Sequence, residues 1–118
     1  MNLNGEFFVI NDTISKIESK IAANDILNSE KKNELLDLIG DLKKEVVELS
    51  KDDDENATSI ANFTSVSAYE AIKSSKNDKL LQLSIEGLST SVRRFEVTHP
   101  DLTKAVNAVC NFLSNLGI

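Results

Sequence analysis

Residues 35–49 read LLDLIGDLKKEVVEL, and the spacing of their apolar side chains decides the fold class. The steps between successive residues alternate between four and three positions in the series Leu35, Ile39, Leu42, Val46 and Leu49. On an α-helix this spacing places all of them on one narrow face, whereas on a strand it would scatter them over both faces. The stretch therefore predicts an amphipathic helix that packs against other helices.

Three further stretches repeat this pattern, and together the four stripes predict an all-α protein. The repeats are Phe7, Ile10, Ile14, Ile17 and Ile21; Leu81, Ile85, Leu88, Val92 and Phe95; and Leu102, Val106, Val109, Leu113 and Leu116. A weaker segment spaces its large apolar residues by threes, which drifts around a helix: Ile60, Phe63, Val66, Tyr69 and Ile72. We expect antiparallel helical hairpins, or a coiled-coil-like helical bundle, of about five helices.

Breaks in the pattern give the expected boundaries within a single helical domain, 1–118. The expected helices are 6–23, 29–50, 57–74, 79–96 and 99–116, with loops at 51–56 and 73–78. The clearest turn holds Thr98, His99, Pro100 and Asp101, because proline is favoured in a first helical turn but not inside a helix. Thr98 and Asp101 have approximately the spacing of a capping box. Gly40 and Gly87, isolated within helices, should allow close helix approach.

Charge and cysteine content argue against several classes of partner. The net charge is −6, and no basic face is evident that would bind nucleic-acid phosphates or an anionic membrane. Cys110 is the only cysteine, so an internal disulfide is excluded. The longest apolar run near the start covers only residues 7–10, which is too short for a signal peptide or a membrane span. We therefore expect a cytoplasmic protein with no nucleic-acid or membrane partner.

Few residues offer material for catalysis or metal binding. His99 has no second His and no Cys or Glu at metal-ligand spacing, and Cys110 flanks an apolar stripe as a small buried residue would. The consecutive acids 52–55 lack the mid-loop glycine of a calcium loop, and Arg93 with Arg94 suits the negative end of a helix. We expect no catalytic, cofactor-binding or metal-binding residue and no cofactor. An enzyme and an acidic nucleic-acid mimic are lesser alternatives.

The chain carries more large apolar side chains than four stripes need. Leu80 and Leu83 lie nearly opposite the stripe of Leu81, so either the helix at 57–74 or another subunit covers them. The interaction residues that we expect are Phe7, Phe8, Ile10, Ile14, Ile17, Leu80 and Leu83. The favoured function is a non-enzymatic helical interaction protein that self-associates as a dimer or higher homo-oligomer. The alternative is an accessory or regulatory subunit that binds a larger bacterial protein complex.

Two motifs near the end of the chain resemble a known family. They are the stretch Phe95-Glu96-Val97-Thr98-His99-Pro100 and the tail Leu113-Ser114-Asn115-Leu116-Gly117-Ile118. Both are similar to the signature of domain-of-unknown-function family 4404, short bacterial proteins in which a Phe-Glu-x-x-His-Pro turn precedes a last helix with a Leu-Gly-Ile-like tail. The segments 81–94 and 14–49 also fit the family's helical layout, with an extra segment at about 51–79. The resemblance implies a helical architecture and no catalytic residue.

Overall fold

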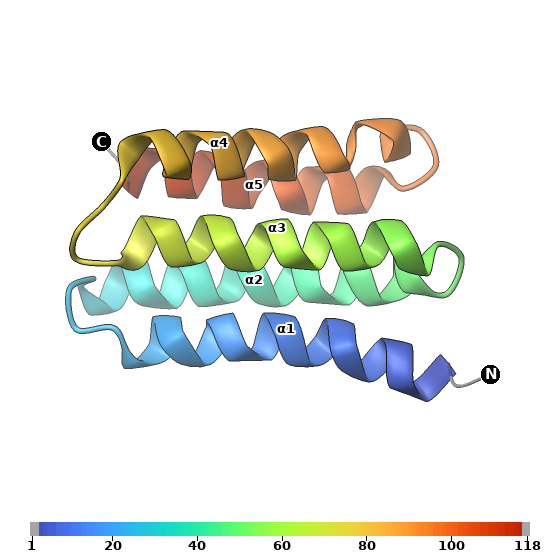
Figure 1. Ribbon diagram of the computed structural model, residues 1–118, viewed down its shortest axis with the longest axis horizontal. Helices are drawn as coiled ribbons and strands as arrows, with labels where there is room; N and C mark the ends of the chain where they lie inside the picture. Colours follow the sequence, from blue (N-terminus) through green and yellow to red (C-terminus); the bar gives the residue numbers. More distant parts are fainter. Residues whose placement is uncertain (1–2, 117–118) are drawn as a thin grey trace.

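The described part of the chain folds as a bundle of five α-helices. The computed structural model describes the backbone of residues 3–116 and the side chains of residues 9–116. This part contains no strand and is built from α1 (Leu3–Ala23), α2 (Ser29–Ser50), α3 (Asp54–Ile72), α4 (Asp78–Ser91), the short 3-10 helix η1 (Arg93–Phe95) and α5 (Pro100–Leu116). Successive α-helices run in opposite directions (Figure 1). The predicted all-α helical bundle is confirmed.

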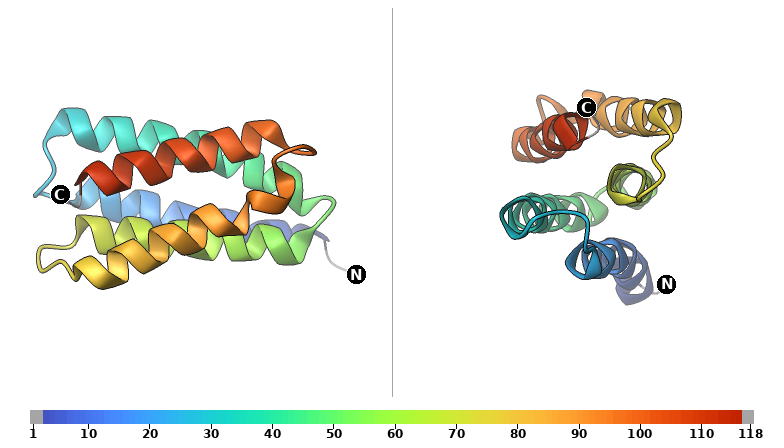
Figure 2. Two further views of the ribbon diagram at one scale, coloured as in Figure 1. Left: turned by 90° about the horizontal axis from the view of Figure 1, so that it is seen from above. Right: turned by 90° about the vertical axis from the view of Figure 1, so that its left-hand side faces the viewer.

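Helices α2, α3, α4 and α5 form a closed ring in which each packs against the next and α5 packs back on α2. Helix α1 packs outside this ring, in contact with α2 and α3. The end-on view of Figure 2 shows this arrangement, with α1 on one side and the α4–α5 pair on the other. Helix α3 is therefore the central helix and contacts all four others.

The four apolar stripes form the core. All five residues of the α2 stripe are buried, as are Ile10, Ile14, Ile17 and Ile21 of α1. The stripes of α4–η1 and α5 are also buried, except that Ile85 and Leu116 are half-buried at the edge. Each fully buried aliphatic side chain contributes about 1.5–3 kcal/mol to the transfer of apolar surface out of water, so the stripes supply the main driving force for folding.

Helix α3 does not bury the large residues whose spacing formed its weak apolar pattern. Of those five, only Ile60 and Ile72 are buried, whereas the rest are exposed. Its buried face consists mainly of small side chains: Ala57, Ala61, Thr64, Ser67, Ala68 and Ala71. The hydroxyls of Thr64 and Ser67 donate to the carbonyls of Ile60 (2.8 Å) and Thr64 (3.2 Å), so their burial leaves no donor unpaired. Small side chains let four helices approach α3 closely.

The predicted loop at 51–56 is too long, because α3 already begins at Asp54. Asp53 caps this helix: its carboxylate accepts hydrogen bonds from the Asn56 backbone N–H (3.1 Å) and side-chain amide (2.7 Å). The side-chain and backbone hydrogen bonds from Asn56 lower the pKa of Asp53. Asp54 and Glu55 lie in the first turn, where the helix dipole favours negative charge. The acidic residues 52–55, which were expected to form a loop, therefore largely form the N-terminus of α3.

The predicted helix at 79–96 is interrupted near its end. Asn77 caps α4 by accepting from the Leu80 N–H (3.0 Å), and the α-helix stops at Ser91. The chain then tightens into η1, which places Phe95 in the core. The 3-10 turn keeps Val92 and Phe95 buried while redirecting the backbone toward α5.

The turn before α5 corrects the capping-box prediction. Pro100 is the first helical residue, and the carbonyl of His99 accepts the first helical hydrogen bond, from the Thr103 N–H (3.2 Å). Thr98 lies one position too early to cap the helix, and its hydroxyl instead contacts Nδ1 of His99 (3.0 Å). Thr98 and His99 therefore form the turn itself, whereas Pro100 and Asp101 open α5.

None of the helices in the described part of the chain is long and apolar enough to span a membrane.

The two candidate caps give a direct test. Asp53→Ala should lower the free energy of unfolding by about 0.5–2 kcal/mol, because the first turn of α3 loses its acceptor. Asp53→Asn should retain most of the stability, since asparagine caps equally well. Thr98→Ala should change stability by less than about 0.5 kcal/mol, as expected for an exposed residue outside a cap. Urea unfolding followed by circular dichroism would measure all three, and an equal loss for Thr98→Ala would restore it as a cap.

Candidate interaction surface

The expected interaction surface at the N-terminus is corrected by the packing of α1. Ile10, Ile14 and Ile17 are at most 2% exposed, because α2 and α3 cover them within the same chain. They are therefore core residues and offer no surface to a partner. The side chains of Phe7 and Phe8 lie outside the described residues.

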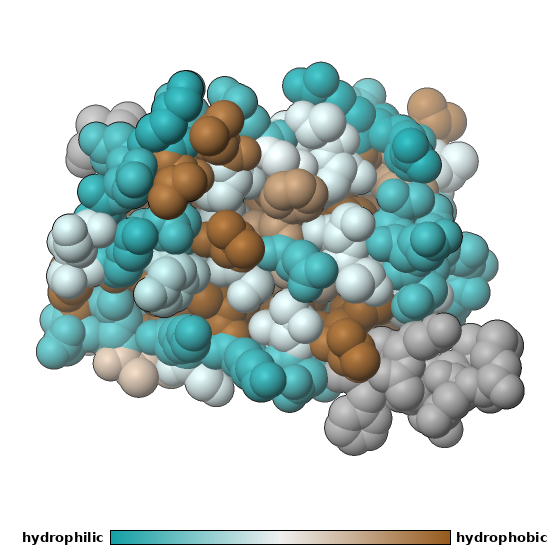
Figure 3. Space-filling view, in the orientation of Figure 1, coloured by the Kyte–Doolittle hydropathy of each residue, from teal (hydrophilic) through white to brown (hydrophobic). Residues whose placement is uncertain are grey.

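Leu80 and Leu83 remain in water on the outer face of α4. They are 47% and 49% exposed, so the first of the two alternatives, cover by the helix at 57–74, is wrong. That helix instead exposes its own large side chains beside them: Phe63 (39%), Val66 (50%) and Tyr69 (44%). We refer to these five side chains as the α3–α4 face. Figure 3 shows apolar patches over α4 and α3 on the front of the molecule.

Gly87 joins the two halves of this face. A Cβ atom at Gly87 would lie 2.7 Å from Cδ1 and 3.1 Å from Cζ of Phe63, so the ring rests directly on the backbone of α4. The expected close approach of helices is therefore found at Gly87. At Gly40 a Cβ would meet nothing within 4 Å, so that glycine has no such role. Sequence reasoning missed Phe63 and Val66 as surface residues because it counted them as part of a stripe.

A groove of about 610 Å³ runs between α1 and α3, next to this face. Val66 and Tyr69 of α3 line one side of it, and Lys16 and Lys20 of α1 line the other. The ammonium groups of Lys20 and Lys73 lie 5.1 Å and 5.9 Å from the centre of the Tyr69 ring, which is cation–π distance. The groove thus combines apolar side chains with two lysines on its α1 side and the Glu70 carboxylate on its α3 side. Lys16 also pairs with Asp12 of its own helix at 3.2 Å.

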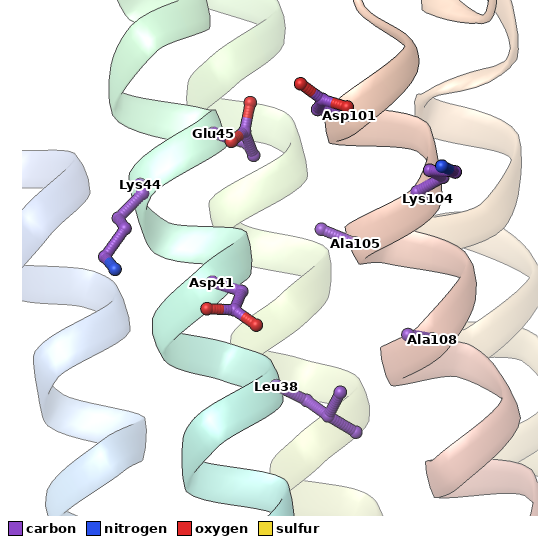
Figure 4. Close-up of a pocket in the computed structure, with 8 residues that line it drawn as sticks. All are labelled: Leu38, Asp41, Lys44, Glu45, Asp101, Lys104, Ala105 and Ala108. Carbon is purple, nitrogen blue, oxygen red and sulfur yellow. The ribbon is translucent and has the colours of Figure 1, made fainter.

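A second groove, of about 480 Å³, lies between α2 and α5. Figure 4 shows Leu38 pointing from α2 toward Ala105 and Ala108 of α5, whereas Lys44 points away from the groove. The remaining lining residues carry charges of both signs: Asp41, Glu45, Asp101 and Lys104. This mixture is typical of a solvated contact between two helices, and charge of neither sign is concentrated in the groove.

The turn residues pack at one end of the bundle. The rings of Phe95 and His99 meet edge to face, with centroids 5.5 Å apart, and the His99 N–H donates to the Phe95 carbonyl (2.8 Å). Nε2 of His99 lies 4.0 Å from a carboxylate oxygen of Asp52 on the loop between α2 and α3. His99 therefore links two loops by packing, which is a structural role.

Cys110 and His99, the only cysteine and the only histidine, lie far apart: Cys110 is on α5, whereas His99 is in the turn that precedes it. They are eleven positions apart in the sequence, which corresponds to roughly 16 Å along the axis of α5. Cys110 is buried, and its Sγ faces the carbonyl of Ile85 at 3.9 Å. Burial raises the pKa of the Cys110 thiol to about 11. Within residues 9–116 there is also no group of three His, Cys, Asp or Glu side chains that could hold a metal ion.

The raised pKa predicts an inert thiol. Cys110 should react with iodoacetamide at pH 8 much more slowly in the folded protein than in urea, because the thiolate is the nucleophile. The unfolded chain releases this proton above about pH 8.5, while the folded chain keeps it to about pH 11. Stability should therefore fall as pH rises through this window, and Cys110→Ala should reduce that slope. Equal labelling rates with and without urea would contradict the assignment.

The contact between Phe63 and Gly87 predicts that the two positions are coupled. In a Phe63→Ala background, Gly87→Ala should raise the free energy of unfolding by about 0.5–1 kcal/mol, the usual gain in helix propensity. In the wild type the gain should be smaller or reversed, because the new methyl group displaces the ring. A double-mutant cycle by urea unfolding measures the difference. Equal effects in both backgrounds would show that the ring does not rest on Gly87.

The comparisons with known proteins add one finding. No curated protein and no solved structure matches the chain. The family described as "Domain of unknown function (DUF4404)" matches residues 48–118. The match begins in the last turn of α2 and continues through α3, α4, η1 and α5. The match runs through residues 51–79, which the resemblance had suggested as an extra segment. The segment 14–49, which was expected to fit the family's layout, lies almost entirely outside the match. Since the match covers more than half of its residues, the chain belongs to the DUF4404 family.

Proposed function

We propose that this protein is a non-enzymatic helical interaction protein that self-associates as a dimer or higher homo-oligomer in the bacterial cytoplasm. The observation that carries the proposal is the α3–α4 face. Half-exposed leucine, valine and aromatic side chains gather there on two adjacent helices, at positions where a monomer leaves them in contact with water. The buried free thiol of Cys110 suits a reducing compartment.

The size of the α3–α4 face supports an interface. Five side chains of this kind, each about half exposed, leave on the order of 400 Å² of apolar surface in water. Contiguous patches of this size on a monomer often serve binding. In a stable interface each protein buries about 800 Å² of its surface, with an apolar centre and a polar rim. The α3–α4 face supplies an apolar centre of suitable size for such an interface.

The separation of Cys110 from His99 supports a non-enzymatic role. A nucleophile and a base act together within hydrogen-bond reach, whereas about three turns of α5 separate His99, before the helix, from Cys110. The exposed apolar side chains lie on another part of the molecule, where neither group takes part. The surface that is unusual for its hydrophobicity is thus separate from the residues with catalytic potential.

The accessory-subunit alternative is favoured by a different observation, the groove between α1 and α3. This groove would bind a partner helix that presents carboxylates to Lys16 and Lys20 and apolar side chains to the Tyr69 ring. In that case the binding partner would be a larger protein, and self-association would not be required.

Self-association is tested by replacing the exposed leucines. At tens of micromolar, light scattering should give a mass of at least twice the 13.0 kDa of one chain. Leu80→Asp with Leu83→Asp should shift the protein to monomer and leave its helical circular dichroism unchanged, because both side chains are half in water. Asn107→Asp, on the exposed side of α5, is the matched control and should leave the mass unchanged.

A monomeric mass for the wild type would refute self-association and favour the accessory-subunit alternative. Ile14→Asp is unsuitable as a test, since it would place a charge in the core and unfold the monomer itself.

A further inference from the structure

We infer that two copies of this chain associate through α4, with the two helices packed antiparallel about a two-fold axis at Leu83. This inference rests on the proposed self-association and specifies where and how it occurs. It follows from the order of residues along the exposed side of α4.

The outward side of α4 has an apolar centre with opposite charges on either side. Leu83 lies at the middle of the exposed part, with Leu80 and Gly87 about one turn away in each direction on the side next to α3. Lys79 lies four residues before Leu83 and Glu86 lies three residues after it, and both are exposed. Among the described residues, neither charge has an ion-pair partner within the chain.

A two-fold axis at Leu83 makes this order self-complementary. In an antiparallel pair, residues equally far before and after the axis lie at the same level, so Lys79 approaches Glu86 and Gly87 of the second copy. The symmetry repeats the contact, which gives two Lys79–Glu86 ion pairs on either side of a Leu83–Leu83 contact. A parallel pair would place Lys79 against Lys79 and Glu86 against Glu86. The charge order therefore selects a second copy in the antiparallel orientation.

The surface next to α3 fits the same arrangement. Leu80 of one copy lies at the level of Glu86 and Gly87 of the other, where the missing side chain of Gly87 leaves the ring of Phe63 uncovered. Leu80 therefore meets an aromatic ring and, beyond it, Val66. The apolar side chains of α3 thus widen a contact that a single pair of helices would leave narrow, and Lys79, Gln82 and Glu86 form its polar rim.

A cysteine that lies on a two-fold axis faces the same cysteine of the second copy. Disulfide formation at position 83 is therefore the sharpest test of the proposed contact. In a Cys110→Ala background, Leu83→Cys should form a disulfide-linked dimer under mild oxidation, because symmetry brings the two residues to the Cα separation of about 4.4–6.8 Å that a disulfide needs. Asn107→Cys in the same background, on the exposed side of α5, should remain largely unlinked. Non-reducing gel electrophoresis measures both yields.

A charge exchange tests the orientation without relying on a new cysteine. Lys79→Glu and Glu86→Lys alone should each raise the dimer dissociation constant about tenfold, because each single change opposes two pairs of like charges. The double variant should return the constant to within about threefold of the wild type, since it only reverses the two ion pairs. Sedimentation equilibrium measures these constants, and circular dichroism checks that each variant stays folded.

The outcomes separate this inference from the proposed function. A wild-type dimer with no linkage through Leu83→Cys, or with no rescue in the double variant, would overturn the α4 contact while leaving self-association in place. A wild-type monomer at tens of micromolar would overturn both. Linkage at position 83 together with rescue would establish the antiparallel α4 pair.

Discussion

The spacing of helices around α3 is the constraint on which the rest of the bundle depends. Four helices contact α3, so most of its surface is covered by neighbours and one side remains open to water. Side chains of alanine, serine and threonine fill the space between them, and two of the hydroxyls satisfy themselves on the backbone of α3. Larger residues on these sides would push the surrounding helices apart and open cavities beside the aliphatic stripes of α2 and α5.

This constraint also explains why the molecule has an apolar surface. With mainly small residues facing its neighbours, α3 carries Phe63, Val66 and Tyr69 on the side that no helix covers. Phe63 and Val66 therefore meet water next to the exposed leucines of α4, and Gly87 lets the Phe63 ring approach the backbone of that helix closely. The close packing of the core and the hydrophobicity of the α3–α4 face thus have a common origin in the order of residues along α3.

The sequence predicted those parts of the fold that large aliphatic residues determine. The stripes of α2 and α5 are buried as expected, because leucine, isoleucine and valine at helical spacing leave one plausible buried face. Helix α3 could not be oriented in this way, since alanine and serine occur both in tight interfaces and on surfaces. Ile10, Ile14 and Ile17 of α1 were misassigned for a related reason. Sequence periodicity identifies the buried face of a helix but not whether the same chain or another covers it.

The closure of α5 onto α2 has a consequence for the order in which the structure forms. Most neighbouring helices in the ring are adjacent in the chain, so their hairpins close short loops and form quickly. The α2–α5 contact joins segments separated by two intervening helices, and it completes the ring only when α5 docks. Until then the apolar stripe of α2 faces water along the seam that α5 will occupy. The longest-lived partly folded state should therefore be an open layer of helices that α5 has not yet closed. The exposed stripe of α2 is the part of this state that is most prone to aggregation in the cell.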